Sequence, residues 1–515
     1  MTMLQGRMLG AAGIVLGLLV AAIYTSRLAD APIYLTHDEV NFSLQGVSMA
    51  RTGHDTNGRW LPVYFSEPEF PAGRDPLAIY AMAAVLTVMP LGDAAVRMPT
   101  ALWGTFTVLA LMWCGARLTG KAWWGVLTAV LLALTPGLFI HSRLALSVIY
   151  PLPFIIAWLA ALHAYAVRPR AWLLALCGWL LGAAIYGYLA AAVMLPVYLA
   201  LTLWQVRAWE RPRVLVPLGI GVAVALAPAV LWGVAHPERY GDLLHAYRVN
   251  DPAAAAIPPL SSWAGARARL VAWWEYFNPD FLFLSGDTSI TNSTRAVGFF
   301  PLAFAWFLPV GLLRLWRGTA FERLLIAALV TAPFAAVVTG TIDLNRYRAM
   351  FVLPFGAIVA TFGVESLWHS RRALIRTACA VALLSVPAQF AGFYGDYMTR
   401  YRESSSVWFG RNIRAALAVV YEHPSPSADL LMSQRIPYAD SYARFYSQVF
   451  GLAEAQAPVL IADERMAGTA ARQGSWLIVG ADESWRSQLS AIDWDTVSTI
   501  TEPSGEASFV IYRRK

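Results

Sequence analysis

The chain has almost no lysine and little charge of either sign. Lysine and arginine together number 39 in 515 residues, and Lys121 and Lys515 are the only lysines. Any anion site must therefore use arginine guanidinium groups, which bind phosphate or carboxylate through two hydrogen bonds. Charged residues make up 14% of the chain, whereas a soluble domain carries roughly 25%. Together with a hydrophobic content of 58% and a mean hydropathy of +0.51, this excludes an ordinary water-soluble fold.

Cysteine is scarce, and the common cofactor motifs are missing. Cys114, Cys177 and Cys379 all lie in apolar stretches, so neither a disulfide framework nor a zinc site is predicted. The sequence has no Walker loop, no GxGxxG in a strand-helix unit, no HExxH and no nucleophile elbow, so no nucleotide cofactor is indicated. The net charge of +7 comes from arginines at segment ends. The positive-inside rule explains them better than a nucleic-acid partner does.

Long apolar runs, in contrast, are abundant. A membrane-spanning helix needs about 20 apolar residues, and twelve segments are candidates: 8–24, 76–92, 97–116, 121–140, 149–167, 171–187, 188–206, 213–233, 297–314, 322–340, 347–367 and 373–393. The first is interpreted as an uncleaved helix. Arginine clusters predict a cytoplasmic N-terminus and an outward-facing region after residue 394. Such a chain crosses an odd number of times, so one segment between residues 76 and 233 is expected to be re-entrant, half-length or split, which leaves 11 or 13 crossings.

These patterns predict an all-α polytopic membrane protein with 11–13 transmembrane helices and a small C-terminal soluble α/β domain. Residues 1–395 would form the membrane domain and 396–515 the soluble domain, on the outward side. The outward loops 25–75 and 234–296 are too long to be simple connections, and the first should contain a segment lying on the membrane surface. After residue 394, an amphipathic stretch at 404–421 precedes the β-like runs LLMSQ, PVLIAD, SWLIVGA and SFVIYRR.

The run THDEV places His37, Asp38 and Glu39 together soon after the first helix. Ionisable groups held near a membrane are costly, which makes them functional candidates. One carboxylate could act as a general base toward an acceptor hydroxyl, and its neighbour could hold a divalent cation beside a phosphate. The alternative is structural: Asp38 would cap a helix running through VNFSLQGVSMA.

Several arginines are candidates for an anionic ligand. Arg74, followed by Asp75 and Pro76, could clamp a lipid-linked phosphate or simply extend to the membrane interface. Arg143, two residues after His141, lies in a predicted outward loop, where the positive-inside rule does not explain it.

Further along the chain, Arg346 and Arg348 stand at another predicted outward helix end, where they fit a phosphate or an ion pair with Asp343. Tyr186 and Tyr188 flank a predicted hairpin turn and are either interface anchors or substrate contacts. Arg97, in AAVRMP, is interpreted as a structural charge at a helix end.

The order of these motifs resembles the GT-C superfamily of glycosyltransferases, in the bacterial branch similar to protein O-mannosyltransferases and lipid A aminoarabinose transferases. The similarity covers roughly residues 1–395. It rests on the acidic pair after the first helix, on Pro76-Leu77, on the tyrosine-rich turn, and on AVRMP, TPGLFIHSR, NPDFLFLSGD and RYRAMFVLP. Relatives often show Glu-Lys before Pro-Pro-Leu, whereas this chain has Arg74-Asp75 before a single proline.

The resemblance implies an inverting sugar transfer on the outer face of a bacterial plasma membrane. The donor would be a polyprenyl-phosphate sugar, Asp38 the catalytic carboxylate, and the acceptor a lipid, glycan or protein in contact with membrane lipids. Family members differ in metal dependence, so Mg²⁺ or Mn²⁺ at Asp38 and Glu39 is an open expectation. The resemblance leaves the phosphate to Arg74, in place of the family's lysine, or to Arg143 or Arg346.

Two other functions are compatible with a polytopic membrane protein. A transporter or flippase for lipid-linked sugars should bury ionisable residues in mid-helix and often contains inverted repeats. The apolar segments here are almost free of Asp, Glu and Lys, and no repeat is evident. A non-catalytic scaffold would leave the acidic cluster unexplained. The sequence therefore favours the transferase.

Overall fold

A computed structural model describes residues 3–67, 70–237, 258, 261–338, 346–423, 429–452, 459–462, 471–489 and 493–515. The chain forms two compact units. Unit 1 consists of Met1–Ser26, Asn57–Ala78 and Pro99–Tyr394, and unit 2 of Arg27–Thr56, Ile79–Met98 and Gly395–Lys515. The chain thus changes unit within α3 (Pro76–Leu86) and again within α4 (Asp93–Thr119).

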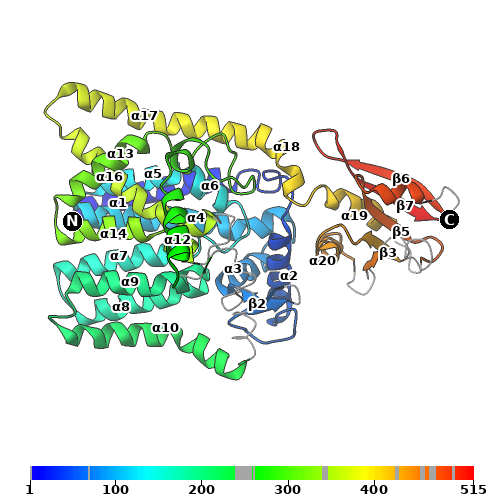
Figure 1. Ribbon diagram of the computed structural model, residues 1–515, viewed down its shortest axis with the longest axis horizontal. Coiled ribbons are helices and arrows are strands. Elements are labelled where there is room, and N and C mark those ends of the chain that lie inside the picture. Colours follow the sequence, from blue (N-terminus) through cyan, green and yellow to red (C-terminus); the bar gives the residue numbers. More distant parts are fainter. Residues whose placement is uncertain are drawn as a thin grey trace. The chain divides into compact units, whose positions relative to one another are not determined.

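Unit 1 is almost entirely helical. Besides a small hairpin of β1 (Phe65–Glu67) and β2 (Phe70–Arg74) and most of α4, it contains α1 (Met3–Thr25), α5 (Ala122–Ala133), α6 (Pro136–Ser142), α7 (Leu152–Val167), α8 (Ala171–Ala183), α9 (Ala190–Val206), α10 (Leu215–Ala235), α12 (Trp263–Glu275), α13 (Phe304–Trp316), α14 (Ala320–Thr331), α15 (Phe334–Val338), α16 (Val352–Trp368) and nearly all of α17 (Ala373–Asp396). Helices α7, α8, α9 and α10 run side by side (Figure 1).

Glycines allow the closest helix pairs of unit 1 to approach backbone to backbone. A methyl group at Gly221 of α10 would overlap the carbonyl of Ala175 on α8. A methyl group at Gly363 of α16 would likewise overlap the carbonyl of Phe307 on α13. Small residues at helix crossings are typical of membrane bundles, where packing rather than hydrophobic transfer drives association.

Each of the twelve predicted apolar segments coincides with a helix or a helix pair. In the described part of the chain, five helices are long and apolar enough to cross a membrane, and six further apolar helices have 10–17 residues. Helices α5 and α6 form a bent pair with an angle of 67°, at a break where Thr135 caps α6 and Pro136 opens it. This bent pair lies within residues 76–233, where a re-entrant, half-length or split segment was expected, and it is either a broken span or a re-entrant loop. The polytopic helical fold is confirmed, and the number of crossings stays a prediction.

Unit 2 joins an early helix to the C-terminal region. Helix α2 (His37–Thr52) packs against α20 (Ala439–Val449), and most of its residues are buried. Helix α2 is therefore part of the core of unit 2, and it does not have one apolar and one exposed face. The adjoining elements are the short α18 (Arg402–Ser404) and α19 (Ile413–Tyr421), which lies within the amphipathic stretch predicted from the sequence.

The C-terminal region of unit 2 contains a five-stranded mixed sheet in the order β4-β3-β5-β7-β6, with α19 and α20 beside it (Figure 1). Strands β4, β3 and β5 are parallel, and β7 is antiparallel to β5 and β6. The four predicted β-like runs contain β3 (Leu430–Ser433), β4 (Val459–Ala462), β5 (Trp476–Gly480) and most of β7 (Ala507–Arg514). The predicted α/β domain is confirmed.

Strand β6 (Trp494–Thr501) was not predicted from the sequence. In this strand only Trp494 and Ile500 are buried, and the intervening residues are polar or exposed. It occupies the edge of the sheet, where one side of the strand has no neighbour and little apolar surface is needed. A hydrophobic run therefore does not mark it.

Helix α10 contains a proline that unit 1 accommodates with a tyrosine. Pro228 lacks an N–H and crowds the preceding turn of the helix. The Tyr186 hydroxyl donates to the Ala225 carbonyl at 2.8 Å and accepts from the Ala229 amide at 3.1 Å. It thus joins the two groups that an uninterrupted α-helix joins directly.

We expect Tyr186→Phe to lower the free energy of unfolding by about 1–3 kcal/mol, because two backbone groups lose a polar partner in an apolar setting. Thermal unfolding of the detergent-purified protein measures the change. Tyr165→Phe on α7 is the control and should leave the midpoint almost unchanged. Equal midpoints for Tyr186→Phe and the wild type would contradict a structural role for this hydroxyl.

Candidate functional site

The acidic cluster predicted from the sequence lies at the start of α2 in unit 2. Thr36 is the N-cap: its hydroxyl accepts from the Glu39 amide, and the Glu39 carboxylate accepts from the Thr36 amide at 2.9 Å. Asp38 is therefore not the cap of this helix, because Thr36 and Glu39 form a capping box. The Asp38 side chain is 44% exposed. It stands in the first turn, where the helix dipole favours a negative charge.

Glu39, the neighbouring acid, has a different environment. Its side chain is fully buried and forms an ion pair with Arg97 of α4, with Nε–Oε1 at 2.8 Å and Nη2–Oε2 at 3.1 Å. Both carboxylate oxygens thus already accept hydrogen bonds. The two adjacent acids therefore differ: Glu39 is buried in an ion pair, whereas Asp38 is half-exposed.

Arg97 also binds the loop that leads into α2. Its Nη1 group donates to the carbonyls of Leu28 and Pro32, and its Nη2 group donates to the carbonyl of Tyr34 at 2.5 Å. With the two bonds to Glu39, five hydrogen bonds match the five N–H donors of a guanidinium. The predicted structural role of Arg97 is what the contacts support. The position of Arg97 at a helix end did not indicate, however, that its side chain binds both the loop before α2 and Glu39 in the first turn of α2.

A second part of the chain reaches the cluster through α20. The ring of His37 stacks on that of Tyr438, with centroids 4.1 Å apart and planes at 2°. The His37 Nε2 atom lies 3.7 Å from Asp38 Oδ2, within ion-pair range. One turn after Tyr438, the Tyr442 hydroxyl donates to the Leu35 carbonyl at 3.0 Å. Sequence reasoning missed Tyr438, because no local motif links it to THDEV.

The arginine that precedes α3 lies in unit 1. Arg74 is only 8% exposed, and the next residue, Asp75, accepts a hydrogen bond from the Ser147 hydroxyl at 2.6 Å. Burial raises the pKa of Asp75 to about 7, although the bonds from Ser147 and the Leu189 amide and the charge of Arg74 act in the opposite direction. Near neutral pH this carboxyl group is therefore partly protonated.

The other predicted phosphate ligands in unit 1 have structural contacts of their own. Arg143 is fully buried, donates to the Tyr24 carbonyl at 2.8 Å and lies over the ring of Phe139. Tyr186 bridges the turn of α10 described above. Tyr188 is part-buried.

The last predicted cluster lies around the short helical turn η4 (Arg346–Ala349). Arg348 is part-buried and lies over the Tyr347 ring, with its Cζ atom 5.8 Å from the centroid. The side chain of Arg346 and all of Asp343 lie outside the described residues. The predicted role of this cluster therefore stays a prediction.

The residues at the start of α2 do not form a good cation site. Divalent cations such as Mg²⁺ need several oxygen ligands. Glu39 is already committed to Arg97 and Thr36, which leaves Asp38 with His37. Within the described ranges, no three His, Cys, Asp or Glu side chains gather in a way that could hold a metal ion.

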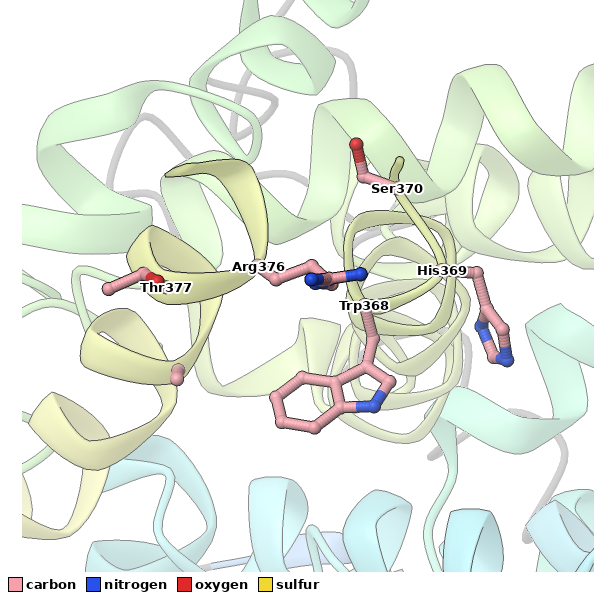
Figure 2. Close-up of a pocket in the computed structure, with 6 residues that line it drawn as sticks. Trp368, His369, Ser370, Arg376 and Thr377 are labelled. Carbon is pink, nitrogen blue, oxygen red and sulfur yellow. The ribbon is translucent and has the colours of Figure 1, made fainter. Parts of the chain in front are cut away.

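Unit 1 also has an open hollow between the end of α16 and the start of α17, with a volume of about 630 Å³. Figure 2 shows the residues that line it: Trp368, His369, Ser370, Arg376, Thr377 and Ala380. No carboxylate is among these lining residues. The ionisable side chains among them are those of His369 and Arg376.

We expect Arg97→Met to lower the free energy of unfolding by about 3–5 kcal/mol, because it leaves the Glu39 carboxylate buried without its partner. Arg97→Lys should also destabilise the protein, since an ammonium has three donors rather than five. Thermal unfolding in detergent measures both. Arg117→Met, in the exposed last turn of the same helix, is the control. A midpoint for Arg97→Met equal to that of the control would contradict the role of the network.

The pKa of Asp75 predicts a pH dependence of stability. Because this pKa is about 7 in the folded protein and about 4 in an unfolded chain, the folded state holds the extra proton. The resulting stabilisation is complete below about pH 4 and is lost as the pH rises through about 7. Thermal midpoints of the wild type should therefore fall relative to Asp75→Asn between pH 4 and pH 8. Parallel curves for the two proteins would refute this.

Comparison with known proteins identifies the fold. No protein-family model and no curated protein matches the sequence. The structure is similar to the crystal structure of ArnT from Cupriavidus metallidurans bound to undecaprenyl phosphate, with a TM-score of 0.63, 14% identity and 97% coverage of both chains. The apo crystal structure of the same protein gives a TM-score of 0.60, again with 14% identity and 97% coverage of both chains. The chain therefore has the fold of ArnT, and the predicted helical architecture with a small C-terminal sheet domain is confirmed.

Proposed function

We propose that this multi-pass membrane protein is a glycosyltransferase that moves a sugar from a polyprenyl-phosphate donor to an acceptor hydroxyl. The observation that carries the proposal is the half-exposed Asp38 carboxylate, held at the start of α2 beside a fully buried ion pair, in a chain with the ArnT fold. That ArnT structure is bound to undecaprenyl phosphate, which supports a lipid-linked donor here.

The proposed chemistry is a single displacement with inversion. The acceptor oxygen attacks the anomeric carbon, and the bond from that carbon to the phosphate oxygen breaks. Polyprenyl phosphate leaves with the electron pair, and the acceptor proton passes to Asp38 as general base. Asp38 suits this role better than Glu39, because only Asp38 is exposed to a ligand and has an oxygen outside the Arg97 network.

The donor phosphate needs a guanidinium, since the chain has only two lysines. Arg74 and Arg348 are the proposed ligands. Arg143 is the weaker choice because its side chain is fully buried, whereas Arg74 is 8% exposed and Arg348 is part-buried. His37 is assigned to Asp38 rather than to the phosphate, because its Nε2 atom lies 3.7 Å from Asp38 Oδ2. Tyr186 belongs with α10.

The proposed reaction has no step through a metal ion, because the residues near Asp38 do not make a good cation site. Adding EDTA to the transfer assay tests the expectation of Mg²⁺ or Mn²⁺ directly. Loss of transfer on chelation, with recovery on adding either cation, would establish a requirement.

The proposed location is a bacterial plasma membrane, with the N-terminus in the cytoplasm and Asp38 and the C-terminal region outside. The arginine distribution supports this orientation. A lipid-linked donor is consistent with it, because soluble nucleotide sugars are confined to the cytoplasm. A flippase for lipid-linked sugars, the alternative function, would move the donor without breaking the bond between sugar and phosphate.

We expect Asp38→Asn to abolish sugar transfer while the protein stays folded. The side chain is half-exposed, so the substitution should change the free energy of unfolding by no more than about 1 kcal/mol, mainly through the lost helix-dipole interaction. The measurement is transfer of radiolabelled sugar from undecaprenyl-phosphate glucose, mannose or arabinose in membrane vesicles. Thermal unfolding is measured in parallel.

Asp440→Asn is a matched control for this variant. Asp440 also stands in the first turn of a helix of unit 2, and its side chain is likewise 44% exposed, but it pairs with Arg444 rather than with His37. The control should transfer sugar at the wild-type rate. Wild-type turnover by Asp38→Asn would show that another group is the base, and movement of intact donor without transfer would favour the flippase.

A further inference from the structure

The contact between His37 and Tyr438 suggests a role for the C-terminal region in the reaction. The two rings are nearly parallel, and both residues remain partly accessible: the His37 side chain is 40% exposed and Tyr438 is 37% exposed. Most of α2 is buried. At the N-terminal end of this helix, Asp38 and the His37 imidazole are partly exposed, and the ring of Tyr438 stacks on that imidazole.

The backbone of Tyr438 has an unusual conformation for a tyrosine. Its φ of 56° and ψ of 33° lie in the left-handed region, and its side chain makes no capping hydrogen bond to α20. Glycine and asparagine adopt this region readily, whereas a bulky side chain is disfavoured. Strained residues of this kind cluster at functional sites, where the surrounding structure holds them in place.

The surrounding structure does hold Tyr438 in place. Hydrogen bonds connect the region of α20 to both ends of α2. Tyr442 donates to the Leu35 carbonyl just before α2, and Arg51 in the last turn of α2 donates to Gln448 at 3.1 Å. The ring of Tyr438 is thus presented by an anchored helix rather than by a loose loop.

We propose that Tyr438 is a positioning residue for the transfer reaction. Its ring restricts rotation of the His37 imidazole, which keeps Nε2 beside the Asp38 carboxylate and holds that carboxylate in one orientation toward the acceptor. This inference rests on the proposed function. It adds a specific task for the C-terminal region: α20 completes the catalytic end of α2.

Three substitutions at this position separate the ring from the backbone. Tyr438→Gly and Tyr438→Asn remove the ring, but both residues suit the left-handed conformation, so the protein should stay folded with a thermal midpoint close to that of the wild type. Tyr438→Phe keeps the ring and should retain transfer within about twofold. For the ring-free variants kcat should fall by about 10- to 100-fold, the effect of misplacing a catalytic group by about 1 Å, with the donor KM changed much less.

The assay uses the full chain in vesicles with undecaprenyl-phosphate glucose, mannose or arabinose, and Asp38→Asn runs beside it. Wild-type kcat in Tyr438→Gly, with Asp38→Asn inactive, overturns the inference and leaves the proposed function standing. A loss of kcat in Tyr438→Gly that is accompanied by an equal loss in Tyr438→Phe also overturns it. If the wild type transfers none of the three sugars, or if Asp38→Asn is fully active, the proposed function fails and this inference fails with it.

Discussion

The arrangement of the candidate site depends on the buried guanidinium of Arg97. Burying a charge without partners costs several kcal/mol, and Arg97 avoids that cost by directing five hydrogen bonds at Glu39 and three carbonyls. In doing so it fixes the loop before α2 and the first turn of α2 together. Because Asp38 is adjacent to Glu39 in the same turn, this network also fixes the position of Asp38.

The same network explains why two adjacent acids differ so much. Glu39 satisfies both the N-cap of α2 and the charge of Arg97, so its oxygens are occupied. The Asp38 side chain is half-exposed and lies 3.7 Å from His37 Nε2. A fixed carboxylate that is open on one side is what general-base chemistry needs, because a mobile group would lose the advantage of orientation.

The sequence predicted the helices of this protein well because apolar length is a local property. All twelve apolar segments overlap helices, and the break at Thr135-Pro136 lies within residues 76–233, where a re-entrant, half-length or split segment was expected. Strand β6 was missed because an edge strand carries little apolar surface. The division of the chain between two units, which runs through α3 and α4, had no local signal either.

The site was only partly predictable for a related reason. Asp38 stood out by its charge near a membrane, but the Thr36 cap was overlooked although Thr36 and Glu39 have the spacing of a capping box. The Glu39–Arg97 pair spans 58 positions, and the Leu35–Tyr442 bond spans 407. No pattern within a short window can pair such residues. Burial raises the pKa of Asp75, and a hydrogen bond that acts in the opposite direction comes from Ser147, which lies 72 positions away.

These separations also bear on the order in which the site is assembled during biosynthesis. Chains emerge from the N-terminus at about 5–20 residues per second, so Glu39 and Arg97 are available to each other long before Tyr438 and Tyr442 are made. The Glu39–Arg97 pair next to Asp38 can therefore form early in synthesis. Tyr438 and α20 are made only after most of the chain has been translated. A chain truncated before α20 would contain Asp38 and His37 without the ring of Tyr438 that stacks on His37.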